Sequence, residues 1–304
     1  MRKKNQFRIS LVIAVVAAMA VSACAIREVK PVAHKTFDPF GLEEVEEEEG
    51  PAPIPSNDNL NGTLWVQTSV EYQSLSRQAF KLASIQLKAA LKDRKRTASL
   101  EQTEKFSNLP PAVILDVDET VLDNSPYQAR LVKSGGSFNP ETWAQWVGEQ
   151  RATAVAGALE FCNFAKEKKV KVFYVTNRTK DLEADTRANL EALGFPLEEE
   201  DTLLMKNERE DWGSAKGTRR IVVGSQHRIL LLVGDNLGDF VDGYKGSIEE
   251  RRVIENEHAD KWGVSWIVVP NPTYGSWMSA IFKGMEKPIT DEQRAKKKYD
   301  TLRD

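Results

Sequence analysis

Four aspartates have the spacing of a catalytic site that binds a cation. Asp116 and Asp118 directly follow one short apolar segment, and Asp235 and Asp239 follow another. If both segments are strands of one parallel sheet, the four carboxylates gather at the same edge of that sheet. Carboxylates so close together repel each other and need a cation. Oxygen donors without histidine favour Mg²⁺, so the pattern predicts a magnesium site.

Two further side chains supply what an anionic substrate needs. Thr176 ends another apolar segment and offers a hydroxyl donor, whereas Lys216 follows a Gly-Ser-Ala turn and offers an ammonium group. Together with Mg²⁺ they would stabilise the negative charge on the non-bridging oxygens of a phosphoryl group during transfer. Because several basic residues lie in this part of the chain, Lys206 is the second candidate for the ammonium. The chemistry predicted is phosphoryl transfer.

These side chains need a sheet to bring them together. Four short apolar segments end in polar motifs, and they cover residues 112–115, 170–175, 229–233 and 266–269. Helical patterns separate them, at residues 154–168, 181–193 and 216–223. Continuous apolar strands that alternate with helices predict an α/β fold, a Rossmann-like parallel sheet with helices on both faces. Ligands bind at the carboxyl edge of such sheets.

The segment 64–91 carries apolar residues three and four positions apart without Gly or Pro, which predicts one long amphipathic helix or two. We expect it to form part of a smaller, mainly helical subdomain. The folded domain is predicted to span residues 61–285. Residues 286–304 form a charged tail that is either a solvated helix or frayed.

The N-terminus has the pattern of a secretory signal peptide. A basic head precedes an apolar run of 13 residues, 9–21. As a helix this run would be about 20 Å long, whereas a bilayer core is about 30 Å thick. We therefore expect residues 1–23 to be removed.

The last residues of this segment, Val21-Ser22-Ala23-Cys24, resemble the bacterial lipobox, in which the cysteine receives a diacylglyceryl group. An ordinary secretory signal is the alternative, but Cys24 stands where a lipobox requires it. Because each buried CH₂ contributes about 0.8 kcal/mol, several acyl chains on Cys24 would anchor the protein to a membrane. In a bacterium with two membranes, Ala25 in place of Asp favours the outer membrane of the cell envelope.

Residues 24–60 are predicted to be an acidic, proline-rich tether, because they contain too few apolar residues to offset the entropy of ordering. A calcium site in the acidic run is the weaker alternative. Over 304 residues, 42 basic and 45 acidic side chains leave no electrostatic footprint for a nucleic acid polymer. Two cysteines and three histidines exclude a disulfide framework and a cysteine-rich zinc cluster.

In their order along the chain, the motif residues resemble the haloacid dehalogenase (HAD) superfamily: Asp116-x-Asp118-x-Thr120, then Thr176, Lys216, and Gly234-Asp235 followed by Asp239. Longer motifs are similar to those of the class C bacterial acid phosphatases, lipoprotein nucleotide phosphatases of the cell envelope. These motifs are Leu64-Trp65-x-Gln67-Thr68-Ser69-x-Glu71-Tyr72, Asp118-Glu119-Thr120-x-Leu122-Asp123-Asn124-Ser125-Pro126-Tyr127, Trp143-x-x-Trp146, Phe173-Tyr174-Val175-Thr176-Asn177-Arg178 and Pro270-Asn271-x-x-Tyr274-Gly275-x-Trp277.

The resemblance implies a mechanism and a ligand set. Asp116 would attack phosphorus and form an aspartyl phosphate, and Asp118 would protonate the leaving oxygen and then deprotonate the attacking water. Mg²⁺ would be held by the carboxylates of Asp116 and Asp235 and by the backbone carbonyl of Asp118. Asp239 would lie beside the metal or serve as a further ligand. The superfamily also implies the haloacid dehalogenase fold, with a small cap insertion at about 124–153.

Two aromatic residues indicate the substrate class. Trp143 and Tyr274 occupy positions where the family stacks a nucleobase or nicotinamide ring, and such stacking contributes about 1–3 kcal/mol. This favours nucleoside monophosphates among small phosphomonoesters. For Trp146, three residues after Trp143, a buried helix face is the better interpretation.

Other classes of protein fit less well. A cysteine phosphatase needs Cys-x5-Arg, but the residue at that distance from Cys162 is Lys168, so Cys162 is predicted to be a buried thiol. A surface lipoprotein that uses this fold as a binding or adhesion module would not need both Asp116 and Asp118. A phosphotransferase that passes the phosphoryl group to an alcohol stays open, as does the oligomeric state.

Overall fold

The computed structural model describes residues 57–198 and 202–303. The predicted signal peptide, Cys24 and all but the last few residues of the predicted tether lie outside this part of the chain. Within the described ranges, no helix is both long enough and apolar enough to cross a membrane.

A parallel sheet of five strands holds the motif residues together, in the order β5-β4-β1-β6-β7. The strands are β1 (Pro111–Leu115), β4 (Lys171–Thr179), β5 (Leu203–Lys206), β6 (Arg228–Gly234) and β7 (Trp266–Val268). Four of them correspond to the apolar segments seen in the sequence. The fifth, β5, was not predicted, because it has only four residues and follows a strongly charged segment.

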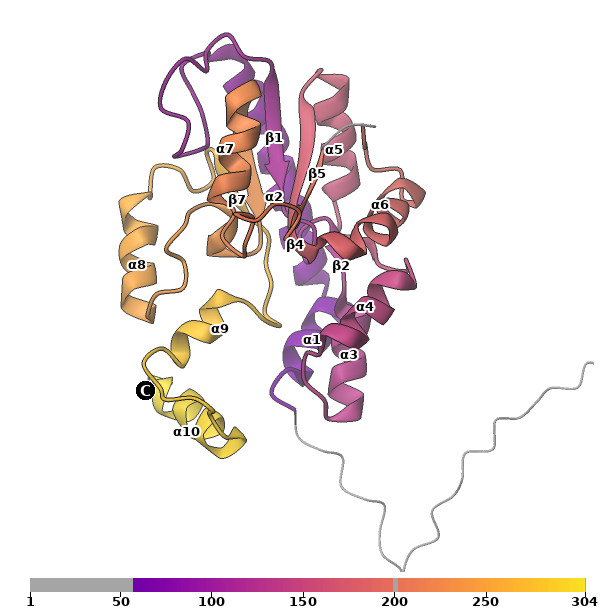
Figure 1. The fold of residues 1–304 in the computed structure, drawn as a ribbon, viewed down its shortest axis with the longest axis vertical. Coiled ribbons are helices and arrows are strands. Elements are labelled where there is room, and N and C mark those ends of the chain that lie inside the picture. Colours follow the sequence, from indigo (N-terminus) through magenta and orange to yellow (C-terminus); the bar gives the residue numbers. More distant parts are fainter. Residues whose placement is uncertain (1–56, 199–201, 304) are drawn as a thin grey trace, which may run out of the picture. The chain divides into compact units, whose positions relative to one another are not determined.

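Alternate residues of the central strand face two different hydrophobic clusters, as the period of two along a strand requires. Val113 and Leu115 pack in one cluster with α2 (Val70–Lys92) and α5 (Ala158–Glu167). Ile114 packs in the other cluster with Val223 of α7 (Gly217–Gln226). Figure 1 shows these helices around the sheet. Helices cover both faces, which confirms the predicted Rossmann-like α/β fold.

The N-terminal amphipathic segment forms two helices, α1 (Leu60–Thr68) and α2. They are separated by Ser69, whose backbone is extended and whose hydroxyl accepts a hydrogen bond from the backbone N–H of Tyr72. A serine in this role satisfies a free donor in the first turn of the new helix. The break lets α1 pack against α3 while α2 packs against α5.

Two helices, α3 (Ser125–Ser134) and α4 (Pro140–Gly148), lie between the short antiparallel strands β2 (Leu122–Asp123) and β3 (Thr153–Ala154). They occupy the same end of the molecule as α1 (Figure 1). This segment directly follows the Asp116 motif, so a helical layer stands beside the carboxyl edge of β1. Both helices fall within residues 124–153, where the cap insertion is predicted.

The remaining helices connect the strands or follow the sheet. A 3₁₀ turn, η1 (Lys180–Leu182), leads into α6 (Glu183–Ala192), and a second turn, η2 (Leu237–Asp239), follows β6. After them come α8 (Ile248–Glu257), α9 (Ser276–Ile281) and, within the charged tail, α10 (Asp291–Thr301). Lys298 of α10 pairs with Asp58 at 2.6 Å, which links the tail to the start of the described chain.

Candidate active site

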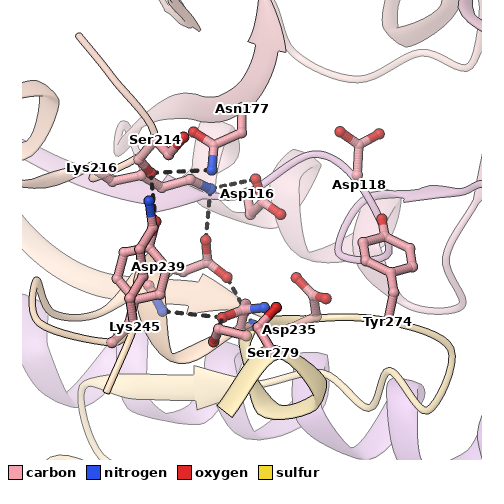
Figure 2. Close-up of a pocket in the computed structure, with 14 residues that line it drawn as sticks. Asp116, Asp118, Asn177, Ser214, Lys216, Asp235, Asp239, Lys245, Tyr274 and Ser279 are labelled. Carbon is pink, nitrogen blue, oxygen red and sulfur yellow. Dashed lines mark hydrogen bonds and ion pairs between the residues drawn. The ribbon is translucent and has the colours of Figure 1, made fainter. Parts of the chain in front are cut away.

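The carboxyl ends of β1 and β6 bring three aspartates together (Figure 2). Asp116 follows β1, Asp235 follows β6, and Asp239 ends the turn η2. One carboxylate oxygen from each of the three lies within 4.8 Å of the others. The four aspartates identified from their spacing therefore divide into a cluster of three and Asp118.

The turn after β6 is built to direct Asp239 into the cluster. The backbone N–H of Asn236 donates to Oδ2 of Asp239 at 2.9 Å, and the Asn236 side chain caps the turn in return. Gly234 is necessary here, because a Cβ at this position would overlap the Asp239 carboxylate. The glycine of the Gly234-Asp235 motif is thus required for steric reasons.

Lys216 lies among these carboxylates, at the start of α7. Its Nζ donates to Oδ1 of Asp116 and, at 2.6 Å, to Oδ1 of Asp239, and its side chain is almost fully buried. Burial by itself lowers the pKa of Lys216, but the charges of the two carboxylates outweigh it and raise the pKa. Lys206, the second candidate, ends the edge strand β5. Lys216 rather than Lys206 thus lies within the cluster.

The cluster carries more negative charge than Lys216 balances. Burial raises the pKa of Asp116 to about 7, with Lys216 opposing the shift and the charges of Asp239 and Asp118 adding to it. Burial and the charges of Asp239 and Asp116 also raise the pKa of Asp235 well above its ordinary value. A bound cation would reverse these shifts because it favours the ionised carboxylates.

The donor set fits a magnesium ion. It consists of hard carboxylate oxygens, and opposite ligands in an octahedron with bonds of about 2.1 Å are about 4 Å apart, within the spread of this cluster. Asp116 and Asp235 would contribute their side chains and Asp118 its backbone carbonyl, and Asp239 would lie beside the ion or serve as a further ligand.

The Asp118 side chain lies apart from the cluster, as Figure 2 shows. Its Oδ1 accepts hydrogen bonds from Nε and Nη2 of Arg178, at 2.9 and 2.8 Å, and from Nδ2 of Asn124 at 2.9 Å. Oδ2 is 3.5 Å from the hydroxyl of Thr176. This separation gives Asp116 and Asp118 different surroundings and therefore allows them different roles.

Thr176 is fully buried, and its hydroxyl accepts a hydrogen bond from the backbone N–H of Arg178 at 3.0 Å. Its neighbour Asn177, rather than Thr176 itself, lines the cavity over the acidic cluster. The structure thus places Thr176 behind Asp118, one side chain away from the open space.

Two cavities meet at Asp118. One, of about 410 Å³, lies over the acidic cluster and Lys216. The other, of about 490 Å³, has a largely apolar wall that includes Tyr127, Phe138 and Trp143. Tyr274 lines both, as do Asp118 and Asn177. A phosphate ester could therefore place its phosphoryl group over the cluster and its alcohol portion against the aromatic wall.

Trp143 and Trp146 have different surroundings although they lie only three residues apart on α4. Trp143 lines the aromatic cavity. Its ring centroid is 5.1 Å from that of Tyr127 and 5.4 Å from the guanidinium of Arg178. Trp146 is buried and donates its Nε1 hydrogen to Oδ1 of Asn124 at 2.9 Å. Trp143 is thus placed to contact a ligand, whereas Trp146 supports the site from behind.

Glu119 belongs to the site although its spacing gave no indication of a role. It has φ of +57° and is almost fully buried, and its carboxylate accepts hydrogen bonds from the Tyr274 hydroxyl and from the backbone N–H of Asn124. Burial and the charges of Asp118, Asp235 and Asp123 raise its pKa well above the ordinary value. Glu119 thereby connects the loop after β1 to the loop after β7.

Comparisons with known proteins agree with this geometry. Residues 57–277 match the family model for the HAD superfamily, subfamily IIIB (acid phosphatase). The class C acid phosphatase from Bacillus anthracis is 32% identical, with a TM-score of 0.71 over 81% of this chain and 97% of that one. A crystal structure of class C acid phosphatase from the same organism with tungstate bound gives 31% identity and a TM-score of 0.70, with the same coverage.

Two curated relatives are more distant. The stem 28 kDa and stem 31 kDa glycoproteins of Glycine max are each 25% identical over 138 residues, which is 44% of this chain. The chain spans about half the length of these relatives, 54% of the first and 47% of the second.

Proposed function

The chain belongs to the HAD superfamily, subfamily IIIB of acid phosphatases, and on this basis we propose that it hydrolyses nucleoside monophosphates with Mg²⁺ through an aspartyl phosphate. As an acid phosphatase of this family it is a phosphomonoesterase that acts on small phosphate esters. The observation that carries the finer proposal is the placement of Asp116, Lys216, Asp235 and Asp239 in one cluster beside Asp118 and an aromatic cavity.

The residues of the cluster divide between holding the cation and binding the phosphoryl group. The carboxylates of Asp116 and Asp235 and the backbone carbonyl of Asp118 would hold Mg²⁺, with Asp239 beside it or as a further ligand. When bound, the ion would neutralise the carboxylates and the phosphoryl oxygens. Lys216 would then direct its charge to the phosphoryl oxygens. The Thr176 hydroxyl is the second proposed donor to these oxygens, although in the structure it faces Asp118.

In the first half of the reaction, a carboxylate oxygen of Asp116 forms a bond to phosphorus while the bond from phosphorus to the leaving oxygen breaks. Asp118 gives its proton to that oxygen. In the second half, Asp118 takes a proton from water, which attacks the aspartyl phosphate, releases inorganic phosphate and restores Asp116. A related class C enzyme binds tungstate, an oxyanion like phosphate, which supports an oxyanion site of this kind.

The aromatic cavity supports nucleoside monophosphates as the substrate class. Its volume of about 490 Å³ falls within the range of small-molecule sites. Trp143 and Tyr274 offer aromatic faces, and stacking of a base would contribute about 1–3 kcal/mol without reading the identity of the base.

The assignment of Asp116 is tested by Asp116→Asn, assayed with p-nitrophenyl phosphate and a nucleoside monophosphate, with and without a chelator. We expect a folded protein without turnover, and a wild-type activity that is lost with the chelator and restored by Mg²⁺. Near wild-type activity of the variant would show that another residue is the nucleophile.

We also propose that the enzyme is a lipoprotein of the cell envelope, held at the outer membrane through Cys24 with residues 24–60 as the tether. The lipobox resemblance supports this. Cys24→Ala should move the enzyme from the membrane fraction to the soluble fraction. Retention of the variant on membranes would contradict the lipid anchor.

A further inference from the structure

We propose that Arg178 and Asn124 position the Asp118 carboxylate for proton transfer through Oδ2, and that Arg178 stabilises the negative charge that Asp118 acquires on giving up its proton. The proposal rests on the proposed function, in which Asp118 is the general acid. Neither residue touches the phosphoryl group; both act through Asp118.

The guanidinium of Arg178 is fixed in place. It is almost fully buried and gives two hydrogen bonds to the same oxygen, Oδ1 of Asp118, from Nε at 2.9 Å and Nη2 at 2.8 Å. Its remaining nitrogen, Nη1, donates to the hydroxyl of Thr186 at 3.1 Å. Every nitrogen of the side chain is therefore engaged, and the fork has a single orientation.

Asn124 adds a third donor to the same oxygen, and its own orientation is determined by Trp146. The indole N–H of Trp146 can only donate, so the amide oxygen of Asn124 must face it, at 2.9 Å. Nδ2 of Asn124 then faces Oδ1 of Asp118, also at 2.9 Å. Because Asn124 is completely buried, this arrangement does not depend on solvent.

All three of these donors meet Oδ1, which leaves Oδ2 as the oxygen that can carry a proton. The Thr176 hydroxyl at 3.5 Å is the hydrogen-bond partner of Oδ2 among the described residues. Asp118 lines both cavities, so it stands where the phosphoryl group and the alcohol portion of a substrate would meet. Because Oδ1 is occupied by these donors, Oδ2 is the oxygen that would donate the proton to the leaving oxygen.

The same contacts are suited to the charge that forms during the reaction. When the proton moves from Oδ2 to the leaving oxygen, the leaving alcohol becomes neutral and Asp118 keeps the electron pair as a carboxylate. Hydrogen bonds from a cation to a carboxylate are stronger than those to a neutral acid. Arg178 therefore stabilises the transition state more as proton transfer becomes more advanced.

The dependence of the rate on the leaving group tests this. Phenyl phosphate and p-nitrophenyl phosphate have similar shapes, but p-nitrophenolate is a weak base that leaves without a proton. We expect kcat/KM of Arg178→Met to fall about 100-fold with phenyl phosphate and less than about tenfold with p-nitrophenyl phosphate. Asn124→Ala should show a smaller difference in the same direction, and Arg178→Lys should recover part of the loss.

Two further variants separate the possible outcomes. Arg228→Met removes a buried guanidinium that contacts backbone carbonyls at the amino-terminal end of β6, the end of the strand opposite the site. Any loss of kcat/KM in this variant should therefore be equal for the two substrates. Asp118→Ala should show the full leaving-group dependence. If Asp118→Ala affects both substrates equally, the general-acid role in the proposed function is wrong. If Asp118→Ala discriminates but Arg178→Met and Arg178→Lys do not, only the role of Arg178 is overturned.

Discussion

Removal of divalent cations should make the stability of the protein depend strongly on pH, in the direction opposite to ordinary acid denaturation. The carboxyl group of Asp116 has its pKa raised from 3.8 to about 7 by burial and by the neighbouring aspartates, with Lys216 opposing the shift. A group with a raised pKa binds its proton more tightly in the folded protein than in the unfolded chain. Its contribution to stability is therefore present below pH 3.8 and is lost as the pH rises through 7.

The size of this loss follows from the shift. One pKa unit corresponds to about 1.4 kcal/mol, so Asp116 alone accounts for about 4 kcal/mol between the two limits. For a domain of this size, 1 kcal/mol shifts Tm by about 2–4 °C, which gives a decrease of about 8–16 °C. The raised pKa values of Asp235 and Glu119 act in the same direction.

Magnesium should cancel much of this dependence, because it binds the ionised carboxylates of the folded state. At a concentration of 100 times Kd it would stabilise the protein by about 2.7 kcal/mol. The measurement is thermal unfolding of the purified protein by circular dichroism between pH 4 and 8, in a chelator and in excess Mg²⁺.

Two variants isolate the contribution of the cluster. Asp116→Asn should weaken the pH dependence in the chelator, because one of the titrating groups is gone while Asp235 and Glu119 remain. Asp242→Asn removes a half-exposed carboxylate that pairs with Arg220, and should leave the dependence unchanged. The reasoning would be refuted if Tm in the chelator stayed constant or rose from pH 4 to 7, or if Mg²⁺ raised Tm equally at pH 4 and at pH 7.

Four further substitutions test other parts of the site. Lys216→Met should lower kcat about 10²–10³-fold, because it removes the charge that faces the phosphoryl oxygens, and it should increase the stabilisation by Mg²⁺ in thermal unfolding, because the ammonium no longer competes. Trp143→Ala should raise KM for nucleoside monophosphates about 5–100-fold and change KM for a small aryl phosphate much less; equal changes would remove the stacking argument. Glu119→Ala and Tyr274→Phe remove the two ends of one hydrogen bond, so in steady-state kinetics the double variant should lose little more kcat/KM than either single one; additive losses would show that the contact has no role.

The sequence determined the sheet more fully than the site. Apolar segments that end in Asp, Thr or Asn predicted four of the five strands and the edge at which ligands bind, because burial on both faces leaves a plain pattern. The edge strand β5 was missed, since four residues beside a charged segment carry too little signal. The helical pattern over residues 64–91 was compatible with one helix or with two. The structure has two, because Ser69 is extended and caps the second helix.

Within the site, the sequence indicated which residue types meet but not the direction of each side chain. Arg178 lies 60 positions from Asp118, and only the pairing of β1 with β4 brings them together. Glu119 turns into the interior because its backbone has a positive φ. A glutamate in the sequence gives no sign of this backbone conformation. Thr176 was expected just past a strand end, but β4 continues to Thr179, so Thr176 lies within the strand, and its side chain contacts Asp118 rather than the open cavity.

The balance of charge in the cluster argues for a divalent ion over a monovalent one. Among the described residues, three carboxylates share this space with the ammonium of Lys216, which leaves an excess of two negative charges when all are ionised. A monovalent cation would leave one uncompensated charge in a buried site, where the cost of an isolated ion is high. A divalent ion makes the cluster neutral, and only then can a doubly charged phosphate ester approach Asp116 without net repulsion.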